Sequence, residues 1–150
     1  MFVPSLDIGD DPPLDEVKRA ADEYNRMAAI GARNGVQQGM HNEGSETYYD
    51  LLFELLDPDL VTFQFQMSGI RHGFVAAEYL TKYPGRFSSI HLQDWDPHAR
   101  TTVAMGQGVI DWTQVFTAAA RAGVRSCFIE LDMEATKRSV EYLKQLRTLG

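Results

Sequence analysis

The feature that most constrains this chain is a regular alternation of short apolar or β-branched runs with longer segments of helical periodicity. In each longer segment, apolar side chains recur every three or four residues, as on one face of a helix. The runs expected to be strands span residues 1–6, 36–42, 60–66, 88–92 and 126–131. Strict alternation of this kind predicts parallel strands joined by right-handed helical crossovers. We therefore expect about five consecutive βα units in one α/β domain that covers residues 1–150.

Turn and capping residues bound the expected helices. The first helix begins near Leu14 and stops at Asn34-Gly35, and the second halts at Asp57-Pro58, where proline disfavours continuation. Asp111 is the expected N-cap of the fourth helix and Gly123 its C-terminal stop. The expected helices fall at residues 14–31, 46–56, 73–83, 111–123 and 134–149.

Two architectures accommodate five βα units. One is an open, doubly wound five-stranded sheet, and the other is a closed (β/α)8 TIM barrel. A complete barrel takes about 250 residues, so the length of 150 residues by itself favours the open sheet.

Composition narrows the class of ligand and the compartment. The 14 basic and 21 acidic residues give a formal charge of −7, which argues against nucleic acid or an anionic membrane as the main partner. Cys127 is the only cysteine, so a disulfide framework and a thiolate metal cage are excluded, and a reducing cytoplasm fits best. The beginning of the sequence has no signal-peptide pattern, and no apolar run approaches membrane-spanning length. A small-molecule ligand is the expected partner.

Polar side chains gather at the carboxyl ends of the expected strands, the edge where parallel α/β folds bind ligands. They are His41, Asn42, Glu43 and Glu46, then Gln64 and Gln66, then His91, Gln93 and Asp94, and finally Glu130 and Asp132. A histidine with several carboxylates predicts a nitrogen and oxygen site for Mn, Mg, Co or Zn. Other interpretations stay open: a hydrogen-bonded structural histidine, a strand-end glutamate facing water, and a turn at Asp96-Pro97.

The segments "YPGRFSSIHLQD" and "GQGVIDW", with "LLDPDLVTFQFQMSG" before them, resemble the xylose isomerase-like TIM-barrel superfamily, the sugar phosphate isomerase/epimerase group. The likeness keeps the segment order over nearly the whole chain. It implies a partial barrel, from about the fourth strand to the eighth helix, and so reverses the preference based on length. We expect a fragment of a longer protein rather than a natural half-barrel, and a homo-oligomer is one way to cover the exposed barrel edges.

The resemblance also implies a ligand set. In such proteins two glutamates, an aspartate and a histidine hold one divalent ion, which grips adjacent oxygens of a sugar or keto-sugar while a glutamate moves a proton. Here His91 matches the histidine, Glu130 the last glutamate and Glu46 the first, with Glu43 as its nearby substitute. Glu46 and Glu130 are then the catalytic candidates.

Two positions depart from the pattern. Gln66 stands where the aspartate ligand is expected, and Gln107 replaces the glutamate of a Gly-Glu-Gly pattern. An amide oxygen can coordinate a hard cation but brings no charge, so we expect a weakened or altered ion site. Substrate-binding or ligand-orienting roles fall to His41, Asn42, Glu43, Asp94, Gln107 and Asp132.

The sequence thus predicts a divalent-metal-assisted sugar isomerase, epimerase or related lyase, or a fragment of one. The alternative is a non-catalytic carbohydrate-binding or assembly module that has lost part of the ligand set.

Overall fold

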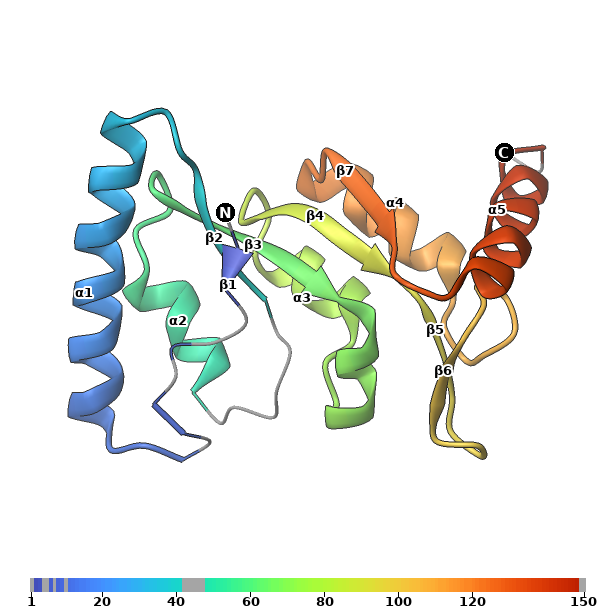
Figure 1. The fold of residues 1–150 in the computed structure, drawn as a ribbon, viewed down its shortest axis with the longest axis horizontal. Helices are drawn as coiled ribbons and strands as arrows, with labels where there is room; N and C mark the ends of the chain where they lie inside the picture. Colours follow the sequence, from blue (N-terminus) through green and yellow to red (C-terminus); the bar gives the residue numbers. More distant parts are fainter. Residues whose placement is uncertain (1, 4–5, 7, 10, 42–47, 149–150) are drawn as a thin grey trace.

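The computed structural model describes residues 2–3, 6, 8–9, 11–41 and 48–148. Its main sheet has five parallel strands that follow one another in chain order (Figure 1). They are β1 (Phe2–Val3), β2 (Gln38–His41), β3 (Val61–Gln66), β4 (Phe87–Leu92) and β7 (Ser126–Ile129). Because each strand lies beside its predecessor, the winding never reverses. A doubly wound sheet needs such a reversal, so the strand order overturns that alternative and favours a barrel segment.

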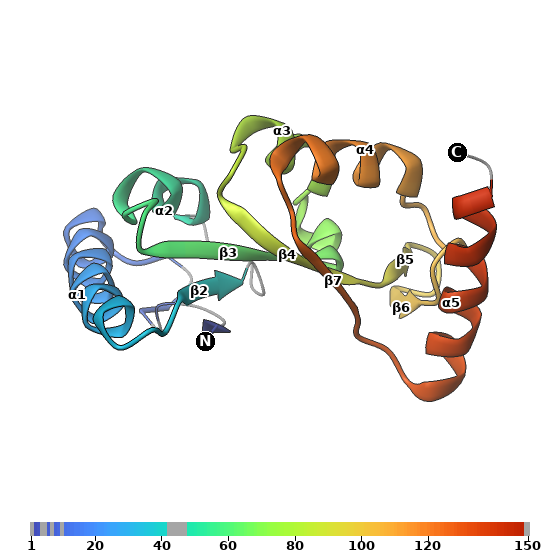
Figure 2. The same cartoon turned by 90° about the horizontal axis from the view of Figure 1, so that it is seen from above.

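The described part of the chain holds five α-helices and one 3-10 helix, of which all but the last, α5, lie between strands. They are α1 (Leu14–Arg33), α2 (Tyr49–Leu55), η1 (Met67–His72), α3 (Ala76–Lys82), α4 (Trp112–Ala122) and α5 (Met133–Thr148). Helices α2, α3 and α4 lie along one side of the sheet, as the outer helices of a barrel do (Figure 2). None of the described helices has the length and apolar character that a membrane span needs.

The expected helix ends are confirmed at α4. The Asp111 side chain accepts a hydrogen bond from the backbone N–H of Gln114 at 3.0 Å, as an N-cap does. Gly123 ends the helix at φ 78°, a left-handed conformation that glycine adopts without a Cβ penalty.

The helix-covered face of the sheet carries an aromatic core. Phe53 of α2 stacks on Tyr83 with ring centroids 3.9 Å apart, and on Phe63 of β3 at 4.2 Å. Arg86 holds α2 in place, because its guanidinium donates to the carbonyls of Phe53 at 2.6 Å and Leu56 at 2.9 Å. The segment Tyr83 to Arg86, part of the "YPGR" motif, therefore joins α2 to the start of β4 and serves the fold.

A β-bulge decides which residues of β4 face the core. Phe63 pairs with Phe87, but the next residue of β3, Gln64, pairs with Ser89, so β4 holds one extra residue, Ser88. Phe87 consequently packs in the aromatic core beside Phe63, whereas Ser89 joins the polar, opposite face. His91, two residues further on, shares the face of Ser89 because side chains alternate along a strand.

A two-stranded antiparallel hairpin that the sequence analysis did not predict follows β4. It consists of β5 (Asp94–Asp96) and β6 (Thr101–Val103), and it extends beyond the carboxyl end of β4 (Figure 1). The turn expected at Asp96-Pro97 is present, since the Asp96 carboxylate accepts from the backbone N–H groups of His98 and Ala99.

The sheet has two edge strands, β1 and β7. On β7, Phe128 is 52% exposed, so this edge is apolar as well as unpaired within the described residues. Helix α5 packs beside the hairpin and the loop after it, where the Ser139 hydroxyl accepts from the backbone N–H of Met105 at 3.0 Å (Figure 1). The homo-oligomer expected to cover such edges stays a prediction.

Candidate functional site

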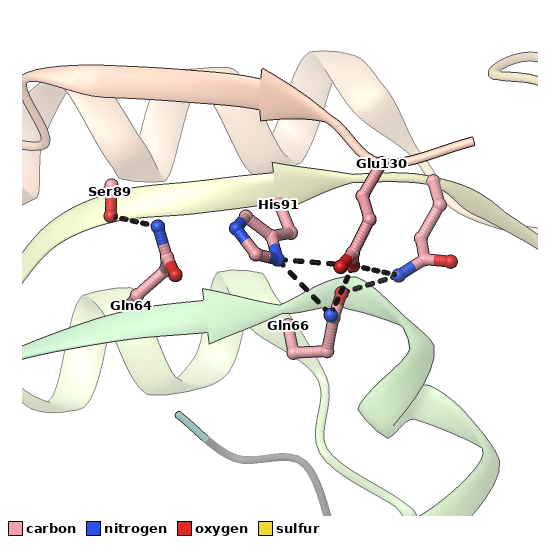
Figure 3. Close-up of polar contacts among 6 residues, drawn as sticks. Gln64, Gln66, Ser89, His91 and Glu130 are labelled. Carbon is pink, nitrogen blue, oxygen red and sulfur yellow. Dashed lines mark hydrogen bonds and ion pairs between the residues drawn. The ribbon is translucent and has the colours of Figure 1, made fainter. Parts of the chain in front are cut away.

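Three neighbouring strands bring four polar side chains together at their carboxyl ends (Figure 3). Gln66 is the last residue of β3, and its register partner on β4 is His91. Gln93 follows β4, and Glu130 follows β7, the next strand of the sheet. We call Gln66, His91, Gln93 and Glu130 the strand-end cluster. The sequence analysis placed all four at this edge, because the carboxyl ends of parallel strands meet there.

One oxygen, Oε2 of Glu130, is the centre of the cluster. The side-chain nitrogen of Gln66 donates to it at 2.6 Å and that of Gln93 at 3.3 Å, while Nδ1 of His91 lies 3.1 Å away. The side chain of Glu130 is 54% exposed and that of His91 only 16%. The carboxylate is thus held from the protein side and open to a ligand from the other.

The amide of Gln66 has a defined orientation. Its Oε1 accepts a short hydrogen bond of 2.5 Å from Nε2 of Gln93, so its Nε2 is the atom that faces Glu130 and His91. Gln66 and Gln93 are 3% and 5% exposed, and burial makes these amide contacts costly to leave unmade. His91 Nδ1 also lies 3.2 Å from Nε2 of Gln66, so a protonated Nδ1 donates to Glu130 and a bare one accepts from Gln66.

Three further polar residues, Gln64, Ser89 and His41, lie near the strand-end cluster. The Gln64 side chain donates to the Ser89 hydroxyl at 2.8 Å, one step back along β3 and β4 (Figure 3). The ring of His41, from the end of β2, meets the His91 ring edge-on with centroids 5.2 Å apart. His41, predicted to lie near the substrate, is therefore brought beside the cluster.

Asp94 has a different environment from the one expected of a ligand-orienting residue. It is 1% exposed, and its four hydrogen bonds come from Trp95 N, Gly106 N, Ile110 N and the indole Nε1 of Trp112, at 2.9 to 3.1 Å. These donors belong to the hairpin and to the "GQGVIDW" segment. Within the described residues, Asp94 therefore ties the loop 106–112 to the strand end instead of touching the cluster.

The two other outlying candidates also make their contacts elsewhere. Asp132 accepts from the backbone N–H of Ala135 at 2.9 Å and so caps the start of α5. Gln107 is exposed in the loop after β6, and its backbone N–H donates to the carbonyl of Ala104. Asn42, Glu43 and Glu46 lie outside the described residues, so their roles stay predictions.

The described donors fit a divalent cation poorly. Among the described residues, no group of three or more His, Cys, Asp or Glu side chains is placed to hold a metal ion. The cluster offers one carboxylate and one imidazole, and Gln66 turns an N–H donor, which cannot coordinate a cation, toward both. Ion binding here would need the Gln66 amide turned over and a further carboxylate, for which Glu46 or Glu43 stay the predicted residues.

Gln93 is the cluster member that the sequence analysis left without a role. The available signal was its spacing, because it stands two residues after His91 and strand side chains alternate between faces. A glutamine carries no metal-ligand or acid–base signature, so it stands out only once its contacts are known.

Comparisons with known proteins agree on the fold. No protein-family model matches the sequence, and no curated protein matches it significantly. Solved structures do match: a sugar phosphate isomerase/epimerase from Parabacteroides distasonis has a TM-score of 0.71 at 22% identity, over 88% of this chain and 55% of that one. A D-tagatose 3-epimerase-like protein has a TM-score of 0.69 at 16% identity, over 99% of this chain and 61% of that one.

A xylose isomerase domain protein from Alicyclobacillus acidocaldarius gives a TM-score of 0.68 at 18% identity, over 99% of this chain and 62% of that one. The chain thus spans 55 to 62% of the length of these three structures. The likenesses confirm the fold expected from the resemblance, a partial TIM barrel.

Proposed function

We propose that this chain binds a sugar or keto-sugar at the carboxyl edge of its sheet and forms the catalytic part of an isomerase or epimerase. The observation that carries the proposal is the strand-end cluster, in which Glu130 is held by nitrogen donors from β3 and β4 while half of its side chain stays exposed. The similar structures whose names include sugar phosphate isomerase/epimerase and tagatose 3-epimerase support the same reaction class.

Glu130 is the proposed proton carrier. Isomerisation or epimerisation beside a carbonyl removes a proton from carbon and returns one, either to a neighbouring carbon or to the opposite face. In the described part of the chain, the hydrogen bonds of the Glu130 side chain all reach Oε2, which leaves Oε1 to take the substrate proton. Because these donors fix Oε2, the Glu130 carboxylate is already oriented before a substrate binds.

His91 is the proposed donor to the substrate oxygen. Its Nδ1 is turned toward Glu130 and Gln66, so Nε2 is the nitrogen left to approach a carbonyl oxygen as negative charge develops on it. His91 lies between Gln66 and Phe128 in the register of the sheet, which holds it at the centre of the proposed site.

Proton exchange with solvent tests this function. Glu130 should catalyse incorporation of deuterium at the carbon beside the carbonyl of a keto-sugar, followed by NMR over a panel of free and phosphorylated keto-sugars. Glu130→Gln keeps the shape of the side chain and should abolish the exchange, whereas Glu141→Gln, on the exposed face of α5, should leave it unchanged. Absence of both exchange and sugar binding across the panel would refute the proposal.

A second candidate function is a non-catalytic carbohydrate-binding module, which is favoured by Gln66 in place of the expected aspartate. It predicts that keto-sugars bind, that Glu130→Gln weakens binding, and that no deuterium enters the sugar. Metal assistance is tested separately by thermal unfolding with Mn, Co, Mg or Zn: assistance predicts a stabilisation that His91→Ala removes, and a flat response to all four ions would rule it out.

A further inference from the structure

We infer that the amide pair of Gln66 and Gln93 takes the place that a divalent cation would fill between Glu130 and His91, so that the strand-end cluster works through hydrogen bonds instead of an ion. This inference rests on the proposed function, which it deepens by naming Gln93 as a positioning residue. The two amide side chains belong to residues that are 3% and 5% exposed, whereas the Glu130 side chain is 54% exposed.

The gap between Glu130 and His91 is already filled by a nitrogen. Oε2 of Glu130 and Nδ1 of His91 are 3.1 Å apart, and Nε2 of Gln66 lies 2.6 Å from the first atom and 3.2 Å from the second (Figure 3). An amide nitrogen donates hydrogen bonds and does not coordinate a cation. Gln66 therefore presents N–H groups at the point where an ion shared by these two atoms would lie.

Gln93 fixes the direction in which the Gln66 amide faces. Nε2 of Gln93 donates to Oε1 of Gln66 at 2.5 Å and to Oε2 of Glu130 at 3.3 Å. If the Gln66 amide turned over, its oxygen would face the Glu130 carboxylate and its nitrogen would face the nitrogen of Gln93. If Gln93 turned as well, its own oxygen would face that carboxylate. Because an ionised carboxylate only accepts, a single arrangement of the three side chains satisfies these contacts.

Charge gives a physical reason for an amide at this position. Gln66 stands where the resemblance implies an aspartate ligand. A carboxylate there would lie against Glu130, and two carboxylates that close together need a cation between them or a proton on one of them. The Gln66 amide removes this need, because it brings a donor to Glu130 in place of a second negative charge.

The amide pair also has a consequence for the proposed reaction. Hydrogen bonds to an ionised acceptor are about twice as strong as neutral ones, so the donors of Gln66 and Gln93 hold the charge of Glu130 before a substrate binds. Polarisation of the substrate carbonyl then falls to Nε2 of His91, the nitrogen that is turned away from Gln66 and Glu130.

Paramagnetic Mn tests the inference by NMR, because the ion broadens the resonances of nearby nuclei. In the wild type, Mn should leave the side-chain amide resonances of Gln66 and Gln93 sharp. Gln93→Glu replaces the fixing donor by a carboxylate, toward which the Gln66 nitrogen should turn, so that the Gln66 oxygen joins Glu130 and His91 as an ion ligand. Mn should then broaden the Gln66 amide resonance beyond detection.

Gln64→Glu is the matched control. It makes the same change on β3, at a residue that is 5% exposed and donates to Ser89, and it leaves the amide pair intact. Mn should not broaden the Gln66 amide resonance in this variant. Broadening in both variants would show that added charge alone recruits the ion, and broadening in neither would show that Gln93 does not keep it out. Either result would overturn the role given to Gln93.

The wild type tests the inference even if a variant does not fold. Deuterium exchange into a keto-sugar should be unchanged by EDTA and by added Mn. Exchange that EDTA abolishes and Mn restores, or broadening of the wild-type Gln66 resonance by Mn, would overturn the inference and leave the proposed function in place. Absence of both exchange and sugar binding, with a Gln66 resonance that stays sharp in Mn, would refute the proposed function, whereas exclusion of the ion by the amide pair would stand.

Discussion

Asp94 and Glu130 are two carboxylates that stand just beyond neighbouring parallel strands, yet the protein uses them in opposite ways. Asp94 is 1% exposed, and nitrogen donors of the surrounding backbone and an indole occupy both of its oxygens. The side chain of Glu130 is 54% exposed, and its donors meet on one oxygen. Position at the strand end therefore does not fix the surroundings of a carboxylate: donors within the protein occupy both oxygens of Asp94, whereas the Glu130 side chain stays half exposed.

The largest expected effect is that of removing the anchor. Asp94→Ala leaves three backbone N–H groups and an indole N–H without the acceptor that they share, a carboxylate that is 1% exposed, and should lower the free energy of unfolding by about 3 kcal/mol or more. Glu130→Ala, at a half-exposed position, should cost less than about 1 kcal/mol. Urea denaturation of both variants measures the difference. Equal losses would mean that the two carboxylates do not differ as described.

The second largest effect on stability is expected from a side chain that contacts Asp94 too closely. A Cβ at Gly108 would lie 2.3 Å from both Oδ1 of Asp94 and the carbonyl oxygen of Trp95. Gly108→Ala should therefore cost about 2 kcal/mol, as overpacking of a close contact does. Val109→Ala, at the adjacent residue that is 56% exposed, is the control and should change stability little. Denaturant midpoints compare the stability of the two variants. An unchanged midpoint for Gly108→Ala would show that the loop is not tightly packed against Asp94.

A smaller effect tests the other carboxylate. Gln66→Asp replaces a donor to Glu130 by a second negative charge and should destabilise the ion-free protein by about 1 kcal/mol. The same change should strengthen the response to Mn or Co, because two carboxylates and an imidazole then share one site. Thermal unfolding with and without ions measures both parts, with Gln66→Asn as the uncharged control of equal length. An ion response as large in Gln66→Asn would show that charge is not the cause.

The smallest expected effect on stability comes from Asp96, a carboxylate in the hairpin. Backbone N–H groups of Ala99 and His98 hold the pKa of Asp96 below its ordinary value of 3.8. A lowered folded-state pKa stabilises the protein above about that pH, and the contribution is lost as the pH falls through the folded pKa. Stability measured between pH 5 and pH 2 should therefore fall slightly less steeply in Asp96→Asn than in the wild type. Identical pH profiles would show that the turn does not depend on the charge.

Much of this arrangement could be predicted from the pattern of residues. The five strands and their helices follow from periodicity, and the meeting of Gln66, His91 and Glu130 follows from the rule that parallel strands end at one edge. The bulge at Ser88 could not be predicted, because one extra residue in a strand leaves no compositional sign. The same limit applies to the hairpin, whose strands of three residues are too short for a periodic signal.

The roles of individual polar residues were harder to predict than their positions. Asp94 and Glu130 look alike in sequence, since each follows an apolar strand and precedes a turn. What separates them is the loop 106–112, which folds back over Asp94 from more than ten residues away. Gln93 was placed at the strand end but given no role for a related reason, because an amide acquires its importance only from the groups that it contacts.

The position of β7 at the sheet edge has a consequence for heat and denaturant. Strand β7 is bonded on one side only within the described residues, and it leads directly into Glu130. Edge strands with few buried contacts open more readily than central strands, without waiting for global unfolding. The proposed activity should consequently be lost before the protein unfolds, because Glu130 would leave its place at temperatures where the aromatic core of β3 and β4 is still intact. A ligand bound at Glu130 should bring the temperature of inactivation closer to that of unfolding.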